Sequence, residues 1–171
     1  IFNPSDLCEV VCIILKDLPY VSIGIISQLS EFLPLVDDKE SLMFCLVNPS
    51  SKYSEWRMRL RVSEQLRKCK EFFDRKKLLE SAAELIEDDT AIVRKDAALS
   101  FAELMQIDDI PILKNYSVSD NHWTRLCAIQ ICANIKFTHS EIKKIIKKLT
   151  KDPVYAVKNE AEKANLSYGF F

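Results

Sequence analysis

Reactive side chains in this sequence are spread along the chain and form no catalytic or metal-binding pattern. The two histidines, His122 and His139, have no cysteine or carboxylate near them at metal-ligand spacing. No cysteine has a neighbouring histidine that could activate its thiolate, and the sequence contains no nucleophile elbow. We therefore expect a protein that is not an enzyme and that carries no metal or other cofactor.

Carboxylate pairs and cysteines have structural explanations in this sequence. Asp88-Asp89 and Asp108-Asp109 stand at predicted helix boundaries, where carboxylates cap the free amides of a helix start. The six cysteines lie in apolar helical stretches and form no CxxC, which favours buried free thiols in a reducing compartment. We accordingly predict a cytoplasmic protein, or one shared between the cytoplasm and the nucleus. Only two glycines are present, too few for a phosphate-binding loop and a series of tight hairpins.

Aromatic side chains in or beside the predicted turns are the first group that could bind a partner. Aromatic and arginine side chains dominate the energetics of protein interfaces. The alternative for each of these rings is a structural role, as a roof over the core of its helix pair. We take Trp56 and Arg57 as the principal anchor. The predicted partner-binding residues are Tyr20, Tyr53, Trp56, Arg57, His122, Trp123 and Tyr155.

Lysines near the end of the chain are the second group. The whole chain carries 24 lysines and arginines against 25 acidic residues, so its net charge of −1 offers no general attraction to nucleic acid or to an anionic membrane. The local cluster lies on essentially one predicted helix without interleaved aromatics, which favours a solvated outer face. The alternative is an adaptor surface for nucleic acid or another protein. The cluster consists of Lys136, Lys143, Lys144, Lys147, Lys148 and Lys151.

A repeated pattern predicts the elements that position these side chains. An apolar residue, usually followed by a basic one, opens a segment of helical apolar spacing about every 31 to 37 residues. The five starts are Val21-Ser22, Met58-Arg59, Val93-Arg94, Thr124-Arg125 and Val157-Lys158. Repeats of this length built from helix pairs are typical of α-solenoids. The sequence thus predicts an all-α solenoid of about five HEAT-like antiparallel helix pairs.

Each predicted pair joins a first helix to a second helix through a turn rich in Asp, Asn, Ser and Pro. We expect a single domain over residues 1–171, and a fragment or processed chain because it begins at Ile1. Thr138 and Glu141 have the spacing of a capping box at the start of the last pair. The predicted repeats span residues 5–33, 38–69, 72–105, 108–136 and 138–168.

Several short motifs resemble one HEAT-repeat family. The segment Glu55-Trp56-Arg57-Met58-Arg59-Leu60 is similar to the Trp-Arg-Val-Arg-Leu segment of the scaffold (A) subunit of protein phosphatase 2A. Val21 to Leu29 resembles an upstream repeat of that family, and Glu71-Phe72-Phe73-Asp74 resembles the family's next repeat opening. Ser140-Glu141-Ile142-Lys143, Lys148-Leu149-Thr150 and Val157-Lys158 are similar to the family's closing repeat.

The resemblance implies a non-catalytic scaffold that helps to assemble a phosphatase holoenzyme. In that family the carboxy-terminal repeats hold the serine/threonine phosphatase catalytic subunit through the turns between paired helices, and earlier repeats mainly hold a regulatory B-type subunit. The resemblance therefore implies contact roles for Trp56 and Arg57, with the catalytic subunit as partner and a B-type subunit as a further candidate. Contacts by the other predicted residues follow only from their position in the repeat.

Overall fold

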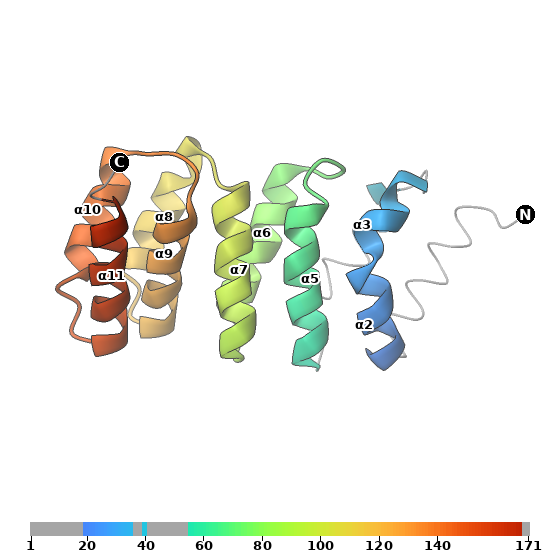
Figure 1. Cartoon of the computed structure of the whole chain (residues 1–171), viewed down its shortest axis with the longest axis horizontal. Helices are drawn as coiled ribbons and strands as arrows, with labels where there is room; N and C mark the ends of the chain where they lie inside the picture. Colours follow the sequence, from blue (N-terminus) through green and yellow to red (C-terminus); the bar gives the residue numbers. More distant parts are fainter. Residues whose placement is uncertain (1–18, 36–38, 41–54, 169–171) are drawn as a thin grey trace, which may run out of the picture. The chain divides into compact units, whose positions relative to one another are not determined.

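The computed structural model describes residues 19–35, 39–40 and 55–168, and these residues contain helices and no strand (Figure 1). The predicted all-α class is therefore confirmed for the described residues. Contacts divide the chain into two compact units, Ile1–Ser100 and Phe101–Phe171, with the boundary inside helix α7 (Ala91–Leu104).

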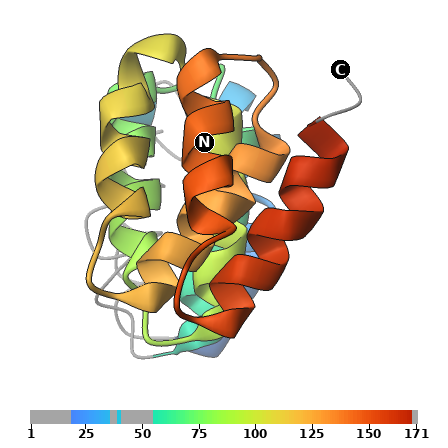
Figure 2. The ribbon, with the colours of Figure 1, turned by 90° about the vertical axis from the view of Figure 1, so that its left-hand side faces the viewer.

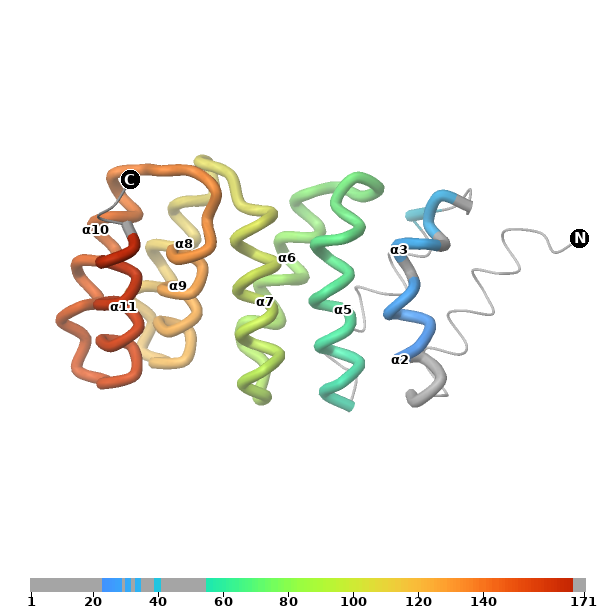
Figure 3. The backbone as a smooth tube through the Cα atoms, in the orientation of Figure 1, coloured from blue at the N-terminus to red at the C-terminus, as the bar shows by residue number. Residues whose placement is uncertain are grey.

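The first unit contains helices α2 (Pro19–Ser27), α3 (Leu29–Phe32), α5 (Trp56–Lys68), α6 (Arg75–Ile86) and the first part of α7, with the 3₁₀ turn η1 (Leu33–Leu35). Helix α5 packs against α2 and α6, and α6 lies behind α5 and α7 in Figure 1. The short turn between α6 and α7 reverses the chain, so the two helices form an antiparallel pair (Figure 3).

A buried glutamine joins α5 to the break between α2 and α3. The Gln65 side chain is fully buried, so its amide needs partners of its own. Its Nε2 donates to the carbonyl oxygen of Ser27 over 3.1 Å, and its Oε1 accepts from the amide of Ser30 over 3.3 Å. The side chain thereby satisfies backbone groups that the interrupted helix leaves open.

Polar side chains also connect α5 to α7. Arg67 Nη1 lies 2.8 Å from Asp96 Oδ2 and 2.9 Å from Ser100 Oγ, while Arg67 Nη2 lies 3.0 Å from Asp96 Oδ1. The hydroxyl of Ser100 donates to the carbonyl oxygen of Ser63 over 2.7 Å. These bonds hold α5 and α7 side by side, as the helices are drawn in Figure 1.

The second unit contains the end of α7, the 3₁₀ turn η3 (Ile107–Asp109) and helices α8 (Ile110–Ser117), α9 (His122–Asn134), α10 (Ser140–Leu149) and α11 (Tyr155–Tyr168). The pairs are α8 with α9 and α10 with α11. Helix α10 also contacts α8 and α9, and α11 packs on α9. Figure 2 shows α10 between α8 and α11. The two pairs thus stack in two layers, with first helices together and second helices together.

The apolar stripes of the second helices form the core, as their spacing predicts. The buried stripe residues are Met58, Val62, Leu66 and Cys69 in α5 and its C-cap; Val93, Ala97, Phe101 and Leu104 in α7; Thr124, Ala128 and Ile131 in α9; and Val157, Ala161 and Ala164 in α11. Two residues predicted for these stripes are only half-buried: Ile135, which is the C-cap of α9, and Ile25 in α2.

The helix starts follow the predicted capping chemistry with one correction. Pro111 lies in the first turn of α8, where a missing amide costs nothing. The Thr138–Glu141 capping box is wrong, because α10 begins one residue later than that box requires. Its N-cap is His139, whose Nδ1 accepts the amide hydrogen of Glu141 over 3.2 Å. None of the helices within residues 19–35 and 55–168 is long and apolar enough to cross a lipid bilayer.

Candidate functional site

Second helices begin on turn residues whose side chains accept amide hydrogens. Glu55 accepts from the amide of Arg57 over 3.3 Å, and Asn121 accepts from that of Trp123 over 3.0 Å. Asp88 and Asp152 accept from the amides two residues further on, over 2.8 and 2.9 Å. Each bond satisfies one of the free amides of the helix start. In α5 and α9 the bonded amide belongs to the second residue of the helix, and in α7 and α11 it belongs to the residue just before the helix.

In the first unit, the first two positions of α5 carry Trp56 and Arg57. The guanidinium carbon of Arg57 lies 4.6 Å from the centre of the Trp56 ring, which is cation–π distance. Arg57 Nη1 also lies 2.8 Å from Glu55 Oε1, and the Arg57 side chain remains 55% exposed. Trp56 is half-buried. The pair therefore presents a stacked, accessible surface at the start of α5, which suits the anchor role predicted for it.

In the second unit, the equivalent positions carry His122 and Trp123 in α9 and Tyr155 in α11. The His122 and Trp123 rings lie 4.4 Å apart, centre to centre, with 39° between their planes. Trp123 is 42% exposed and Tyr155 78% exposed. Because α9 and α11 pack together and run in the same direction, these three side chains lie at one end of the unit (Figure 1). Trp123 and Tyr155 are thus exposed and His122 is half-buried, so none of the three is a buried roof of the core.

The remaining predicted residues are Tyr20 and Tyr53, and Ile92 is a further exposed residue at a helix start. Tyr20 is the second residue of α2, the same position as Trp123 in α9, and Tyr53 lies outside the described residues. Ile92, the second residue of α7, is also exposed, but it is not among the predicted partner-binding residues, which are aromatic side chains, a histidine and an arginine. The available signal was its place immediately before the buried Val93, which matches Trp123 before Thr124.

Two of the basic residues that follow the starts, Arg59 and Arg125, hold neighbouring helix pairs together, one in each unit. In the first unit, Arg59 donates from Nε to Asp88 Oδ2 over 2.5 Å and from Nη2 to Asp89 Oδ1 over 2.7 Å. The Arg59 and Asp88 side chains are 8% and 4% exposed, whereas Asp89 is 87% exposed. The hydrogen bond to Asp88 raises the pKa of Arg59. Arg59 thus links α5 to the turn of the following pair.

Arg125 makes the same link in the second unit. It donates from Nε and Nη2 to the Asp152 carboxylate over 2.7 and 3.1 Å, and from Nη1 to the carbonyl oxygens of Ser119 and Asp120 over 2.8 and 3.0 Å. The hydrogen bond from Arg125 is the main cause that lowers the pKa of Asp152. Arg125 therefore connects the turn before α9 to the turn before α11.

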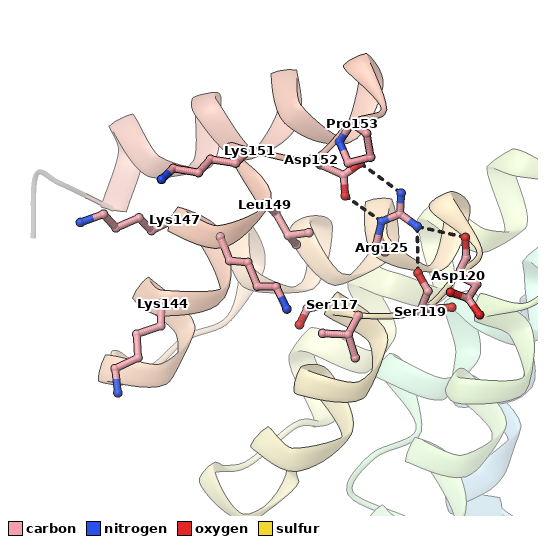
Figure 4. Close-up of a pocket in the computed structure, with 12 residues that line it drawn as sticks. Ser117, Ser119, Asp120, Arg125, Lys144, Lys147, Leu149, Lys151, Asp152 and Pro153 are labelled. Atoms are coloured by element: carbon pink, nitrogen blue, oxygen red, sulfur yellow. Dashed lines mark hydrogen bonds and ion pairs between the residues drawn. The ribbon is translucent and has the colours of Figure 1, made fainter.

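A groove lies beside the Arg125–Asp152 pair, and both residues line it. It has a volume of about 780 Å³ and lies between the α8–α9 turn and the C-terminal end of α10. Its lysines come from one face of α10 and the residues just after it, and Figure 4 shows the labelled ones extending to one side, away from Arg125. The sequence interpretation of this cluster as a solvated outer face did not include the groove. The groove lysines are Lys144, Lys147, Lys148 and Lys151.

The remaining candidate side chains have structural roles. Cys69, Cys127 and Cys132 are buried free thiols, and burial raises the pKa of Cys69 and Cys132 to about 12. Asp109 accepts the amide hydrogen of Gln106 in a capping box. Within the described part of the chain, no three His, Cys, Asp or Glu side chains are grouped closely enough to hold a metal ion.

No protein-family model matches this sequence, and no curated protein sequence matches it. The geometry of the helix starts and of the groove is therefore the basis for assigning a function.

Proposed function

We propose that this chain is a non-catalytic scaffold, an α-solenoid of HEAT-like helix pairs, that binds a serine/threonine phosphatase catalytic subunit through the turns between paired helices. The observation that carries the proposal is the Trp56–Arg57 stack at the start of α5. This stack lies in the segment whose sequence resembles the phosphatase scaffold family. A regulatory B-type subunit is a further candidate partner, and the cytoplasm, or the cytoplasm and the nucleus, is the proposed location.

The links between successive pairs support a repeated architecture. Arg59 reaches Asp88 across 29 residues, and Arg125 reaches Asp152 across 27 residues, each from the fourth residue of a second helix to the turn of the next pair. One repeating register explains both contacts. Bidentate arginine–carboxylate bonds also fix orientation better than lysine would. A rigid stack of this kind suits a scaffold, because preformed turns bind a partner with little ordering cost.

The side chains at the helix starts support the use of the turns as the binding edge. Trp56 offers apolar area, and Arg57 offers directed donors for a carboxylate or carbonyl of the partner. Trp123 and Tyr155 provide exposed rings at the equivalent positions in the second unit. Rings of this kind combine a large contact area with few rotatable bonds, which is why they recur at interface centres.

Alanine substitution of the anchor tests the proposal. We expect Trp56→Ala or Arg57→Ala to weaken binding of a phosphatase 2A catalytic subunit by about 1–3 kcal/mol, because each removes a central contact. A biosensor titration at physiological salt would measure the change, and circular dichroism would verify that the helix content is retained. Arg61→Ala is the matched control, since Arg61 lies on the same helix and its ion pair among the described residues is the local one with Glu64. Unchanged affinity in both anchor variants would refute the site.

A second candidate function is an adaptor that binds nucleic acid or another protein through the basic C-terminal helix. It is favoured by the position of four lysines on the groove beside Arg125. Salt dependence separates the two candidates, because phosphate binding weakens steeply as salt rises, with a slope that follows the number of lysines engaged.

A further inference from the structure

The groove of the second unit has an unequal distribution of charge. Its lining contains five cationic side chains and two carboxylates. Arg125 and Asp152 bond to each other, and Lys144 bonds to Glu141 over 2.6 Å. Lys147, Lys148 and Lys151 are exposed and form no ion pair within the described residues. Three ammonium groups along one side of the groove are thus available to a ligand.

The backbone of the three lysines is ordered, since Lys147 and Lys148 belong to α10 and Lys151 lies in the turn that follows it. Lys151 follows Lys148 by three residues and Lys147 by four, and its amide donates to the carbonyl oxygen of Lys148 over 3.1 Å, so the turn after α10 keeps it beside the end of the helix. The opposite face of α10 is anchored in the core, where Ile142, Ile146 and Leu149 are at most 2% exposed. The three ammonium groups therefore extend from an ordered backbone, and their flexible side chains can each reach a carboxylate of a bound ligand.

The groove also contains apolar surface close to the lysines. Val118, the C-cap of α8, is 57% exposed, and Pro153 is exposed as well. Both residues line the groove with the lysines. A ligand that places an apolar side chain against Val118 would remove this surface from water, which adds a hydrophobic contribution to the charge attraction.

We propose that this groove binds an acidic peptide segment of a partner protein, with its carboxylates on Lys147, Lys148 and Lys151 and an apolar side chain against Val118. Nucleic acid fits less well on two counts. No aromatic side chain lines the groove, so bases would find no stacking platform. The exposed carboxylate of Asp120 on the α8–α9 turn would repel a continuous phosphate chain, whereas a peptide can place a neutral or basic residue there.

This site shares no residue with the Trp56–Arg57 anchor, so its test is independent of the phosphatase proposal. The probe is a fluorescein-labelled peptide of glutamates interrupted by leucines, titrated with the full chain by fluorescence anisotropy. A peptide with glutamine at every glutamate position controls for charge. A single-stranded DNA oligonucleotide of equal length represents the nucleic-acid alternative.

We expect the acidic peptide to bind, and the triple variant Lys147→Gln, Lys148→Gln, Lys151→Gln to bind it roughly tenfold or more weakly, because it loses three charge contacts. The matched control is Lys143→Gln, Lys158→Gln, Lys163→Gln, which removes the same charge from α10 and α11 outside the groove and should change affinity less than about twofold. Val118→Ser should weaken binding of the peptide and leave binding of the oligonucleotide unchanged.

Three results would overturn the proposal. The first is no binding of the acidic peptide by the intact chain. The second is an equal loss in the groove and control triple variants, which would indicate attraction by net charge alone. The third is tighter binding of the oligonucleotide than of the peptide through the same lysines, which would make the groove a nucleic-acid site. Circular dichroism verifies folding, and all the substituted lysines are exposed, so retained helix content is expected.

Discussion

Asp88→Ala should lower the unfolding free energy of the first unit by about 3–5 kcal/mol, because it leaves the Arg59 guanidinium buried without its main counter-charge. The Arg59 side chain is 8% exposed and that of Asp88 4% exposed, so water cannot replace the lost carboxylate. The substitution also removes the acceptor for the amide of Thr90 at the start of α7. The cost therefore combines a broken ion pair with a lost helix cap.

The neighbouring carboxylate is the natural control. Asp89 also bonds to Arg59, but its side chain is 87% exposed, so Asp89→Ala should change stability little. The sequence has two tryptophans, Trp56 in the first unit and Trp123 in the second. In a Trp123→Phe background, urea unfolding followed by fluorescence reports on the first unit alone. Equal effects of Asp88→Ala and Asp89→Ala would show that burial does not decide the strength of this pair.

Arg125→Leu should lower the unfolding free energy of the second unit by about 3 kcal/mol at neutral pH. The change leaves the Asp152 carboxylate, 4% exposed, without its guanidinium, and it deprives the carbonyl oxygens of Ser119 and Asp120 of a donor. Urea unfolding in a Trp56→Phe background, followed through Trp123, measures the loss. Lys136→Leu is the control, because its ammonium pairs with Glu103 on the surface of the same unit. A comparable loss in both variants would contradict the account.

The same pair predicts how the loss depends on pH. The pKa of Asp152 is lower in the folded chain than its usual value, so the folded state binds fewer protons at that carboxyl than the unfolded state does. Its contribution is therefore complete above about pH 4, the ordinary aspartate range, and is lost as pH falls through the lowered folded value. In Arg125→Leu the carboxyl loses the guanidinium, which is the main group that keeps it ionised. The stability difference between the two proteins should consequently shrink as the pH falls below about 4.

The helical spacing of apolar residues predicted most of the buried core, because the burial of a stripe depends mainly on local spacing. Met58, Val62 and Leu66 recur on one side of a helix whatever packs against them, and all three are buried. The recurring basic residue was equally visible in the sequence. Its role as a link between helix pairs could not be predicted, because the bond from Arg59 to Asp88, 29 residues away, depends on the register between the pairs. The break between α2 and α3 could not be predicted either, because the side chain that bonds to its backbone, Gln65, comes from another helix.

The exposed aromatic residues could be predicted from the sequence and the groove could not, because the first depend on local signals and the second depends on how helices pack. Trp123 and Tyr155 are exposed at helix starts because a capped turn and a buried third residue place them there, and both signals are local. The groove requires α10 to lie beside the α8–α9 turn, so the lysine spacing alone could not distinguish it from a solvated face. Ile92 was missed because its exposure follows from its register and not from its residue type.

Hydrogen exchange of this chain with and without a phosphatase 2A catalytic subunit would test the central claim most directly. The first amides of a helix bond at most to a capping side chain near the surface, so they exchange faster in the free chain than interior amides do and report a bound surface sensitively. If the turns form the binding edge, exchange should slow on binding in the first turns of α5, α9 and α11 and stay unchanged at the opposite ends of these helices. Binding that slows exchange only at those opposite ends, or no binding at all, would contradict the central claim.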